Sequence, residues 1–509
     1  MPEKSSSNPS KSRILVRGVN WIGDAVMTIP ALRALRRHFK ESEISLLVKP
    51  WVAPLFYDSP YSDNLILYPS EANSLREKWR FARSLKKEGF SKAILLQNAF
   101  DAAFIAFVAQ IPERIGYARD LRGCLLTERI PYSGEDRRLH HIDYYLELLR
   151  RAGIPAEYSR PWIKLSLFER LEARRRLSSL KRPILAINPG AAYGSAKRWF
   201  PERFSRVADA FMTFTDGSVV LLGGDREIEI TKDIRKNIKG EDIMILTGKT
   251  NLRELIAIIS ECELLLSNDS GPMHIGYAVG TPLVALFGST SPDLTGPRGF
   301  LDIVIKKDTP CSPCFKRTCE EMACMEAIEV EEVFEAIKSL IPSHKAVFFD
   351  RDGTLCKDTG YLNDPSRLEV FEDIKELRRL REAGFKLIGV TNQSGIARGI
   401  VDEKNAKQIN SVFIERYDFD DFYYCPHHPD EHCECRKPEP GMLLRARAEH
   451  NIDFKGSWVV GDKESDILLA KAVGARTVLV KTGELKGHQE ADYMAENLTE
   501  AVRIILRES

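Results

Sequence analysis

The stretch AVFFDRDGTL, residues 346–355, runs from four apolar residues straight into two carboxylates, Asp350 and Asp352. Side chains alternate along an extended strand, so both carboxylates are expected on the same side of the chain. Mg²⁺ takes one or two protein carboxylates together with phosphate oxygens and water. The stretch therefore predicts a buried strand of an α/β sheet that ends in a site for a hard cation.

Three other segments also end predicted strands with groups that suit phosphate. They are VTNQSG at 390–395, RKP at 436–438 and GDKESD at 461–466. The first offers a hydroxyl and free backbone N–H groups, the second two cations, and the third further carboxylates. Together with residues 346–355, they predict a single phosphoryl-transfer site in the last third of the chain.

A group of soft metal ligands lies between the second and the last of these segments. Within eleven residues stand Cys425, His427, Cys433 and Cys435. Three thiols and one imidazole suit a closed, tetrahedral Zn²⁺ site. His428 and His432 compete for the histidine position. Because all four positions are filled, the zinc is expected to be structural and to fix the loop that leads into residues 436–438.

The first two thirds of the chain alternate between apolar strands and helices. Strands are expected at 13–17, 44–48, 183–188, 219–222, 264–267 and 282–287, and helices at 25–39 and 167–180. Up to about residue 155 the order strand, helix, strand is expected to repeat. This alternation predicts parallel sheets with helices on both faces.

The same alternation divides the chain into a tail and three domains. The tail, residues 1–12, is rich in Ser, Lys and Pro and is expected to be disordered. Two doubly wound domains are expected over 13–165 and 181–340, and a third over 345–509. The very short link before the third domain predicts domains that touch.

Composition narrows the classes of protein further. The 509 residues carry a formal net charge of +1, which gives no support for non-specific nucleic-acid binding. No run of about 18 uncharged apolar residues predicts a membrane span, and residues 94–111 are interpreted as a strand followed by a helix. The polar N-terminus does not resemble a secretory signal, so the ten cysteines are expected to be reduced, in the cytoplasm.

The first two thirds carry polar groups at the ends of their own predicted strands. Asp24 follows the first strand, where it can serve as a base or simply as a helix cap. Lys197 and the turn SNDSGPMH at 267–274 follow later strands. The small residues of that turn can cradle an anion at a helix N-terminus, or can serve the fold alone.

The four segments of the last third resemble, in their order, those of the haloacid dehalogenase phosphatase superfamily. With the zinc loop, residues 346–483 are similar to the D-glycero-D-manno-heptose 1,7-bisphosphate 7-phosphatases; the histidinol-phosphate phosphatases, which share that loop, are the nearest alternative. The resemblance implies that Asp350 is the nucleophile and Asp352 the general acid and base. It implies Mg²⁺ bound by Asp350, Asp462 and the backbone of Asp352. The implied contacts to substrate or phosphate are Asp358, Tyr361, Thr391, Asn392, Gln393, Ser394, Arg436 and Lys437.

Residues 13–340 resemble the ADP-heptose:lipopolysaccharide heptosyltransferases, and the second enzyme of that group most closely. The matching stretches are 17–30, 98–107, 191–199 and 267–292. The resemblance implies two Rossmann-like domains facing a cleft, the GT-B type, followed here by the haloacid-dehalogenase-like domain. It implies that Asp24 deprotonates the acceptor hydroxyl. The implied nucleotide-sugar contacts are Lys197, Asp269, Ser270, Gly271 and His274.

The two resemblances together predict a bifunctional enzyme of lipopolysaccharide inner-core synthesis. Its expected partners are ADP-heptose, a lipid-linked core acceptor at the inner face of the inner membrane, and heptose bisphosphate, with no nucleic acid. One alternative is a different nucleotide-sugar transferase joined to a histidinol-phosphate phosphatase. Another is a phosphatase joined to a module that only binds nucleotide or lipid. A second cysteine cluster can hold zinc or an iron–sulfur cluster or remain reduced; it comprises Cys311, Cys314, Cys319 and Cys324.

Overall fold

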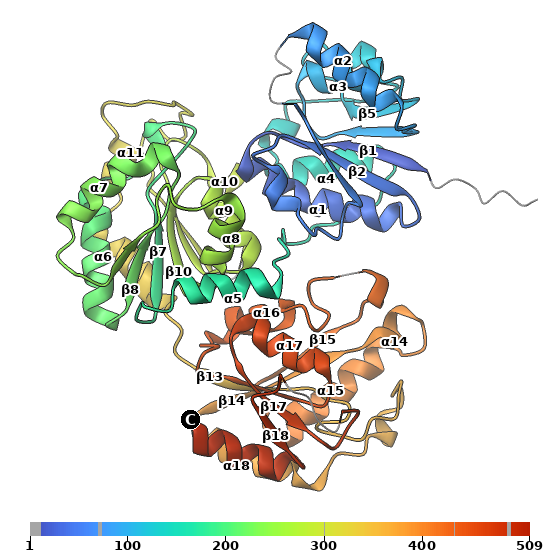
Figure 1. Ribbon diagram of the computed structural model, residues 1–509, viewed down its shortest axis with the longest axis vertical. Helices are drawn as coiled ribbons and strands as arrows, with labels where there is room; N and C mark the ends of the chain where they lie inside the picture. The colour runs from blue at the N-terminus through green and yellow to red at the C-terminus, as the bar shows by residue number, and fades with distance from the viewer. Residues whose placement is uncertain (1–11, 70–73, 300, 432, 486–489) are drawn as a thin grey trace, which may run out of the picture. The chain divides into compact units, whose positions relative to one another are not determined.

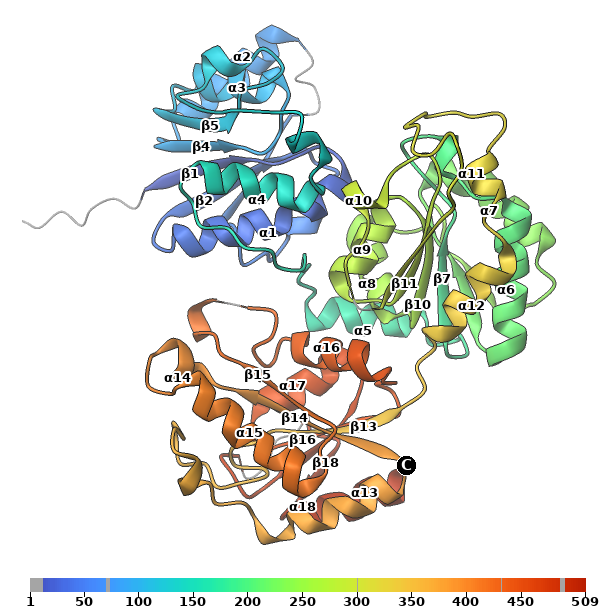
Figure 2. The ribbon, with the colours of Figure 1, turned by 180° about the vertical axis from the view of Figure 1, so that it is seen from behind.

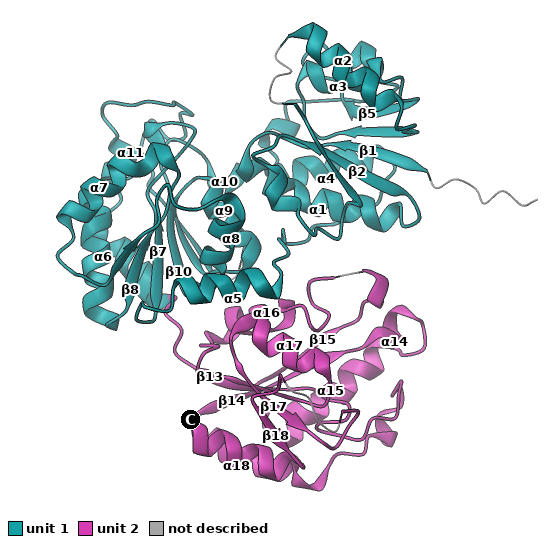
Figure 3. Ribbon diagram, viewed as in Figure 1, with its two compact units in different colours: residues 1–339 teal, residues 340–509 magenta. Residues whose placement is uncertain are grey.

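The computed structural model describes residues 12–69, 74–299, 301–431, 433–485 and 490–509, so the expected tail lies, except for Ser12, outside the described residues. Within the described residues the chain forms three six-stranded sheets whose neighbouring strands run parallel (Figure 1). This confirms the predicted α/β class. The chain divides into two compact units, residues 1–339 and 340–509 (Figure 3), and the first unit contains two of the sheets.

The first sheet has the doubly wound order β3-β2-β1-β4-β5-β6. Its strands are β1 Arg13–Arg17, β2 Glu43–Val48, β3 Asn64–Leu67, β4 Lys92–Leu95, β5 Glu113–Tyr117 and β6 Glu128–Ile130. Its helices are α1 Ile22–His38, α2 Leu75–Lys86, α3 Phe100–Val108 and α4 His141–Arg151. The helices α1 and α4 cover one face, and α2 and α3 cover the other (Figure 2).

Two local predictions for this part were wrong. The helix α1 begins at Ile22 rather than at residue 25, and Trp21 occupies the N-cap position with an extended backbone and no side-chain capping hydrogen bond. Asp24 therefore lies in the first helical turn, not in the loop before it. No α-helix joins β2 to β3; Pro54 stands in a 3₁₀ turn, Ala53–Phe56, that makes the connection.

The second sheet repeats the doubly wound plan with the order β12-β11-β10-β7-β8-β9. Its strands are β7 Ile184–Asn188, β8 Ser218–Leu221, β9 Ile243–Ile245, β10 Leu264–Asn268, β11 Leu283–Phe287 and β12 Asp302–Lys306. Its helices are α5 Leu167–Arg176, α6 Pro201–Thr215, α7 Ile228–Asn237, α8 Leu252–Glu261, α9 Gly271–Val279, α10 Pro292–Thr295, α11 Ala323–Glu326 and α12 Val330–Ser339. In both sheets the strand order reverses at the centre, which is where sheets of this kind bind ligands.

The two sheets of the first unit share one core. Buried apolar side chains of α1 and α4 form a continuous cluster with those of α8 and α9. The two folds approach closely at Gly23 of α1, where a Cβ atom would lie 2.6 Å from the Cδ2 atom of His274 on α9. Only glycine allows this contact, so the sequence at position 23 brings the two nucleotide-binding-type folds together.

The third sheet, in the second unit, has the order β15-β14-β13-β16-β17-β18. Its strands are β13 Lys345–Phe349, β14 Phe385–Asn392, β15 Asp421–Cys425, β16 Trp458–Gly461, β17 Arg476–Val480 and β18 Tyr493–Ala495. Its helices are α13 Arg378–Glu382, α14 Ser394–Ala397, α15 Glu403–Tyr417, α16 Gly441–His450, α17 Glu464–Val473 and α18 Leu498–Glu508. Separate apolar clusters fill its two faces, one including α18 and the other α16 and α17.

Among the described residues, no helix combines the length and the apolar character that crossing a membrane requires.

Candidate active sites

Three carboxylates converge at the centre of the third sheet. Asp350 directly follows β13, Asp462 directly follows the neighbouring β16, and Asp466 lies in the first turn of α17. One oxygen from each lies within 4.8 Å of the others, and all three residues are buried. Buried carboxylates at this spacing repel one another unless a cation lies among them, so the cluster fits Mg²⁺.

One lysine partly balances this charge. The Nζ atom of Lys437 lies 2.7 Å from a carboxylate oxygen of Asp350 and 2.7 Å from one of Asp466. Burial lowers the pKa of Lys437, but the two carboxylates outweigh it and hold that pKa above its usual value. Burial, reinforced by the charge of Asp350, raises the pKa of Asp462 to about 6. One cation for three carboxylates leaves the site with a deficit of positive charge.

Asp352 lies beside this cluster but turns its carboxylate elsewhere. Arg351, which is fully buried, donates to it at 3.1 and 3.0 Å, and the Gln393 amide donates at 2.9 Å. The same amide donates at 2.9 Å to the hydroxyl of Thr391. The carboxylates gathered in the structure are thus those of Asp350, Asp462 and Asp466. The role of the Asp352 backbone in Mg²⁺ binding stays a prediction.

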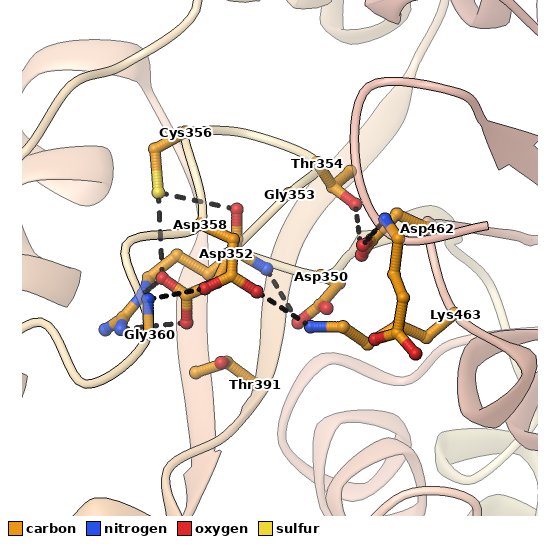
Figure 4. Close-up of polar contacts among 12 residues, drawn as sticks. Asp350, Asp352, Gly353, Thr354, Cys356, Asp358, Gly360, Thr391, Asp462 and Lys463 are labelled. Carbon is orange, nitrogen blue, oxygen red and sulfur yellow. Dashed lines mark hydrogen bonds and ion pairs between the residues drawn. The ribbon is translucent and has the colours of Figure 1, made fainter. Parts of the chain in front are cut away.

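Two of the predicted substrate contacts, Asp358 and Thr391, lie around Asp350 and Asp352 (Figure 4). Asp358 pairs with Lys463 at 3.2 Å. Burial lowers the pKa of Lys463, but the charges of Asp350, Asp462 and Asp358 outweigh burial and raise that pKa. Tyr361 is half exposed and packs against Gly395, next to Ser394. Asn392 and Lys437 exchange hydrogen bonds through the amide side chain and the backbone.

Arg436 carries the clearest sign of an absent partner. Its Nη1 atom is buried and finds no hydrogen-bond partner among the described residues. A buried guanidinium nitrogen without a partner is costly unless a ligand completes it. The structure therefore supports Arg436 as a contact for a phosphate or another anion.

The four predicted zinc ligands are brought together. The Sγ atom of Cys433 lies 3.4 Å from that of Cys425 and 3.5 Å from that of Cys435. The Nδ1 atom of His427 lies 3.1 Å from the Sγ atom of Cys435 and 3.6 Å from that of Cys425. Ligands about 2.1–2.3 Å from one ion would be separated by edges of this order. His428 instead engages Asp430, and His432 lies outside the described residues. The donor set fits Zn²⁺.

In the first unit, Asp24 has a partner that the sequence did not point out. Its Oδ1 atom lies 3.1 Å from Nδ1 of His141, the first residue of α4. Both side chains remain partly exposed, at 29% for Asp24 and 40% for His141. An accessible carboxylate oriented by an imidazole is suited to accept a proton from a bound hydroxyl.

The predicted nucleotide-sugar residues follow the strands β7 and β10. Lys197 and Asp269 form a buried ion pair of 2.5 Å, and the Thr290 hydroxyl donates to the same oxygen of Asp269 at 2.6 Å. Asn188 donates to the Ser270 hydroxyl at 3.1 Å. Gly271 begins α9 and lies against Ile22 of α1.

His274 feels the charge of both Asp269, in this group, and Asp24. It is buried, and burial lowers its pKa to about 4 although the charges of Asp269 and Asp24 act in the other direction. His274 is therefore neutral at physiological pH. The predicted base and the predicted nucleotide-sugar residues are close enough to act electrostatically on one imidazole.

Two buried histidines give the first unit a pH dependence. Burial lowers the pKa values of His140 and His274 to about 4, below the value of about 6.5 for an unfolded chain. Protonation therefore favours unfolding, and stability is full above about pH 6.5 and falls as the pH drops toward 4. We expect each histidine to lower the free energy of unfolding by about 2 kcal/mol when the pH falls from 7 to 5.

Tryptophan fluorescence can follow this transition, because five of the six tryptophans lie in residues 1–339. In denaturant titrations, His140→Asn should narrow the difference in unfolding free energy between pH 7 and pH 5, whereas the exposed His38→Asn should leave it unchanged. An equal pH dependence in the wild type and in His140→Asn would contradict the assignment.

Two other features stand apart from these groups. Among the described residues, the four thiols between Cys311 and Cys324 are not gathered as those of the zinc loop are; Cys311 is exposed and Cys324 is buried. A surface cavity of about 490 Å³ lies between α2 and α3 and is lined by Trp79, Arg83 and Phe107 among others. It contains none of the predicted site residues.

Two family models match the chain. The model described as glycosyltransferase family 9 (heptosyltransferase) matches residues 78–324, and the model described as HAD-hydrolase-like matches residues 434–501. The two matches lie in different units of the structure.

Individual proteins match both parts. Lipooligosaccharide heptosyltransferase 2 of Haemophilus influenzae is 30% identical over 306 residues, 56% of this chain and 85% of that protein. The D-glycero-beta-D-manno-heptose-1,7-bisphosphate 7-phosphatase of Pasteurella multocida is 41% identical over 177 residues, 32% of this chain and 96% of that protein. The solved structure of ADP-heptose LPS heptosyltransferase II of Escherichia coli is 27% identical, with a TM-score of 0.57, and covers 64% of this chain and 98% of that one.

Proposed function

The chain belongs to two families, the family 9 heptosyltransferases in its first unit and the heptose bisphosphate 7-phosphatases in its second, and we propose how the residues of each unit carry out its reaction. It is a fused enzyme of lipopolysaccharide inner-core biosynthesis. Its substrates are ADP-heptose with a lipopolysaccharide core acceptor, and heptose 1,7-bisphosphate. The observation that carries the proposal is that each unit gathers its own reactive carboxylate, Asp24 or Asp350, with the partners that its reaction needs.

In the phosphatase unit, a carboxylate oxygen of Asp350 attacks the phosphorus of the 7-phosphate and displaces the sugar oxygen. Asp352, held by Arg351 and Gln393, gives that oxygen a proton and later takes one from the water that hydrolyses the aspartyl-phosphate. Thr391 and Lys437 hold the transferring group. Mg²⁺ at the cluster of Asp350, Asp462 and Asp466 supplies positive charge that reduces repulsion between anions.

In the transferase unit, the acceptor hydroxyl attacks the anomeric carbon of heptose, and its proton passes to Asp24. The bond from that carbon to the diphosphate breaks, and ADP leaves with inversion. His141 is a positioning residue that orients Asp24. Lys197 and the turn Asp269–Gly271 hold the diphosphate at the start of α9, where backbone N–H groups favour anions.

A substrate screen tests the assignment of the phosphatase unit. Phosphate release from heptose 1,7-bisphosphate should exceed release from histidinol phosphate and from hexose phosphates at equal concentration. Preference for histidinol phosphate would support the alternative that shares the zinc loop.

We also propose that one structural Zn²⁺ is bound by Cys425, His427, Cys433 and Cys435. Elemental analysis of the full chain should give about one zinc per chain, and Cys433→Ser should abolish it. Phosphate release should fall without vanishing, because the loop leads into Arg436 and Lys437 while the ion takes no chemical part. Cys311→Ser is the matched control and should retain zinc; retention of zinc by Cys433→Ser would refute the site.

The location of the enzyme follows from its acceptor. Because the core acceptor is lipid-linked, we propose that the transferase works in the cytoplasm at the inner face of the inner membrane.

A further inference from the structure

The segment that follows β12 folds back onto the nucleotide-sugar residues. The backbone N–H groups of Cys314 and Phe315 both donate to the carbonyl of Ser289, at 3.1 and 2.7 Å, and the Ser312 hydroxyl donates to the Gly288 carbonyl at 2.6 Å. Ser289 directly precedes Thr290, whose hydroxyl holds Asp269. The segment is thus bonded to Ser289, and the next residue, Thr290, contacts the buried pair of Lys197 and Asp269.

A second set of contacts fixes the same segment to the loop that carries Lys197. The Tyr193 hydroxyl donates to the Phe315 carbonyl at 3.0 Å, and the Ala196 N–H donates to the Arg317 carbonyl at 3.0 Å. At Gly194 a Cβ atom would lie 2.1 Å from that carbonyl oxygen. Glycine at position 194 therefore lets the backbone of Arg317 approach Lys197.

The side chains of Arg317 and Lys197 meet at one aromatic ring. The guanidinium carbon of Arg317 lies 5.2 Å from the ring centroid of Tyr193, and Nζ of Lys197 lies 4.9 Å from the same centroid. The two positive charges are therefore separated by no more than the sum of these two distances. An anion bound beside the Tyr193 ring would lie near both side chains, and the guanidinium would attract it.

Among the described cations around this site, some are paired with carboxylates and one is not. Lys197 is neutralised by Asp269, Arg198 lies 4.0 Å from Glu227, and His274 is neutral because burial lowers its pKa to about 4. Within the part of the chain that the structure describes, no ion pair joins Arg317 to a carboxylate; Arg317 is exposed and its guanidinium lies over the Tyr193 ring. Arg317 is thus a cation of this group left without a counter-charge.

We propose that Arg317 binds the diphosphate of the nucleotide sugar, and that the segment 312–317 serves to present it. A guanidinium offers paired N–H donors that match phosphate oxygens, and charge-assisted bonds of this kind are among the strongest. As the bond to the anomeric carbon breaks, negative charge grows on the diphosphate, so Arg317 also favours departure of ADP. This inference rests on the proposed transferase function.

Calorimetric titration of the full chain with ADP, AMP and adenosine tests the proposal. Arg317→Ala should weaken ADP binding about 10- to 100-fold and leave adenosine binding unchanged, because only the diphosphate meets the guanidinium. Arg317→Lys should recover part of the affinity. Lys316→Ala, the neighbouring exposed cation, is the matched control and should bind ADP like the wild type. With ADP-heptose, Arg317→Ala should also lower kcat/KM for transfer.

The outcomes separate this inference from the function on which it rests. If Arg317→Ala binds ADP as the wild type does, or loses ADP and adenosine equally, Arg317 is not a diphosphate ligand, while the transferase assignment stands. If the wild-type chain itself fails to bind ADP, the transferase assignment fails and this inference falls with it.

Discussion

Replacing Asp350 by Asn is expected to lower phosphate release from heptose 1,7-bisphosphate by at least about 10⁴-fold, because the covalent step loses its nucleophile. The fold should survive. Lys437 loses its 2.7 Å contact with Asp350 but keeps Asp466 at 2.7 Å and the Val390 carbonyl at 3.1 Å, so no buried charge is left alone. Release of inorganic phosphate under saturating Mg²⁺, with the unfolding curve measured beside it, checks both parts.

Two comparisons make the Asp350 result specific. Asp418→Asn changes an exposed residue at the end of α15 with positive φ, which Asn tolerates, and it should leave turnover unchanged. Asp352→Asn should slow turnover by roughly 10²–10⁴-fold, because acid–base help is lost while the nucleophile remains. Full turnover in Asp350→Asn would remove the covalent mechanism.

Replacing Asp24 by Ala is expected to slow heptosyl transfer by at least about 10²-fold. Asp24 lies in the first turn of α1 with His141 at 3.1 Å, while the proposed diphosphate ligands Lys197 and Asp269 lie in loops that follow strands of the second sheet. The affinity for ADP-heptose should therefore change little, and the slower transfer should appear as a lower kcat. Steady-state transfer to a core acceptor, with donor binding measured separately, distinguishes the two quantities.

Asp24→Asn sharpens this experiment, because an amide keeps a hydrogen-bonding partner for His141 but cannot accept the proton. We expect it to be as slow as Asp24→Ala. Asp120→Asn is the control and should transfer normally, because it changes an exposed acid in the loop after β5 whose positive φ Asn tolerates. Normal transfer at saturation with lost donor binding would make Asp24 a binding residue or a helix cap.

The sequence predicted the strand ends well and the side-chain partners poorly. Asp350, Thr391 and Asp462 were placed correctly at the ends of β13, β14 and β16, because strand patterns and polar segments are local. The four proposed zinc ligands were grouped correctly for the same reason, since all four lie within eleven residues.

What the sequence missed depends on contacts between distant residues. His141 is 117 positions from Asp24 and meets it only because α4 packs against α1. Arg317 reaches the loop of Lys197 through backbone contacts more than 100 positions apart, and no motif marks it. Asp466 was inside a segment already singled out, four residues after Asp462, and the helical start of α17 was the signal that could have found it.

The central claim is that one chain carries two separate reactions. The most direct measurement assays purified Asp24→Ala and Asp350→Asn, each as the full chain, for both heptosyl transfer from ADP-heptose and phosphate release from heptose 1,7-bisphosphate. We predict that Asp24→Ala loses only transfer and that Asp350→Asn loses only phosphate release. Loss of both activities in either folded variant, or of neither in both, would contradict the account.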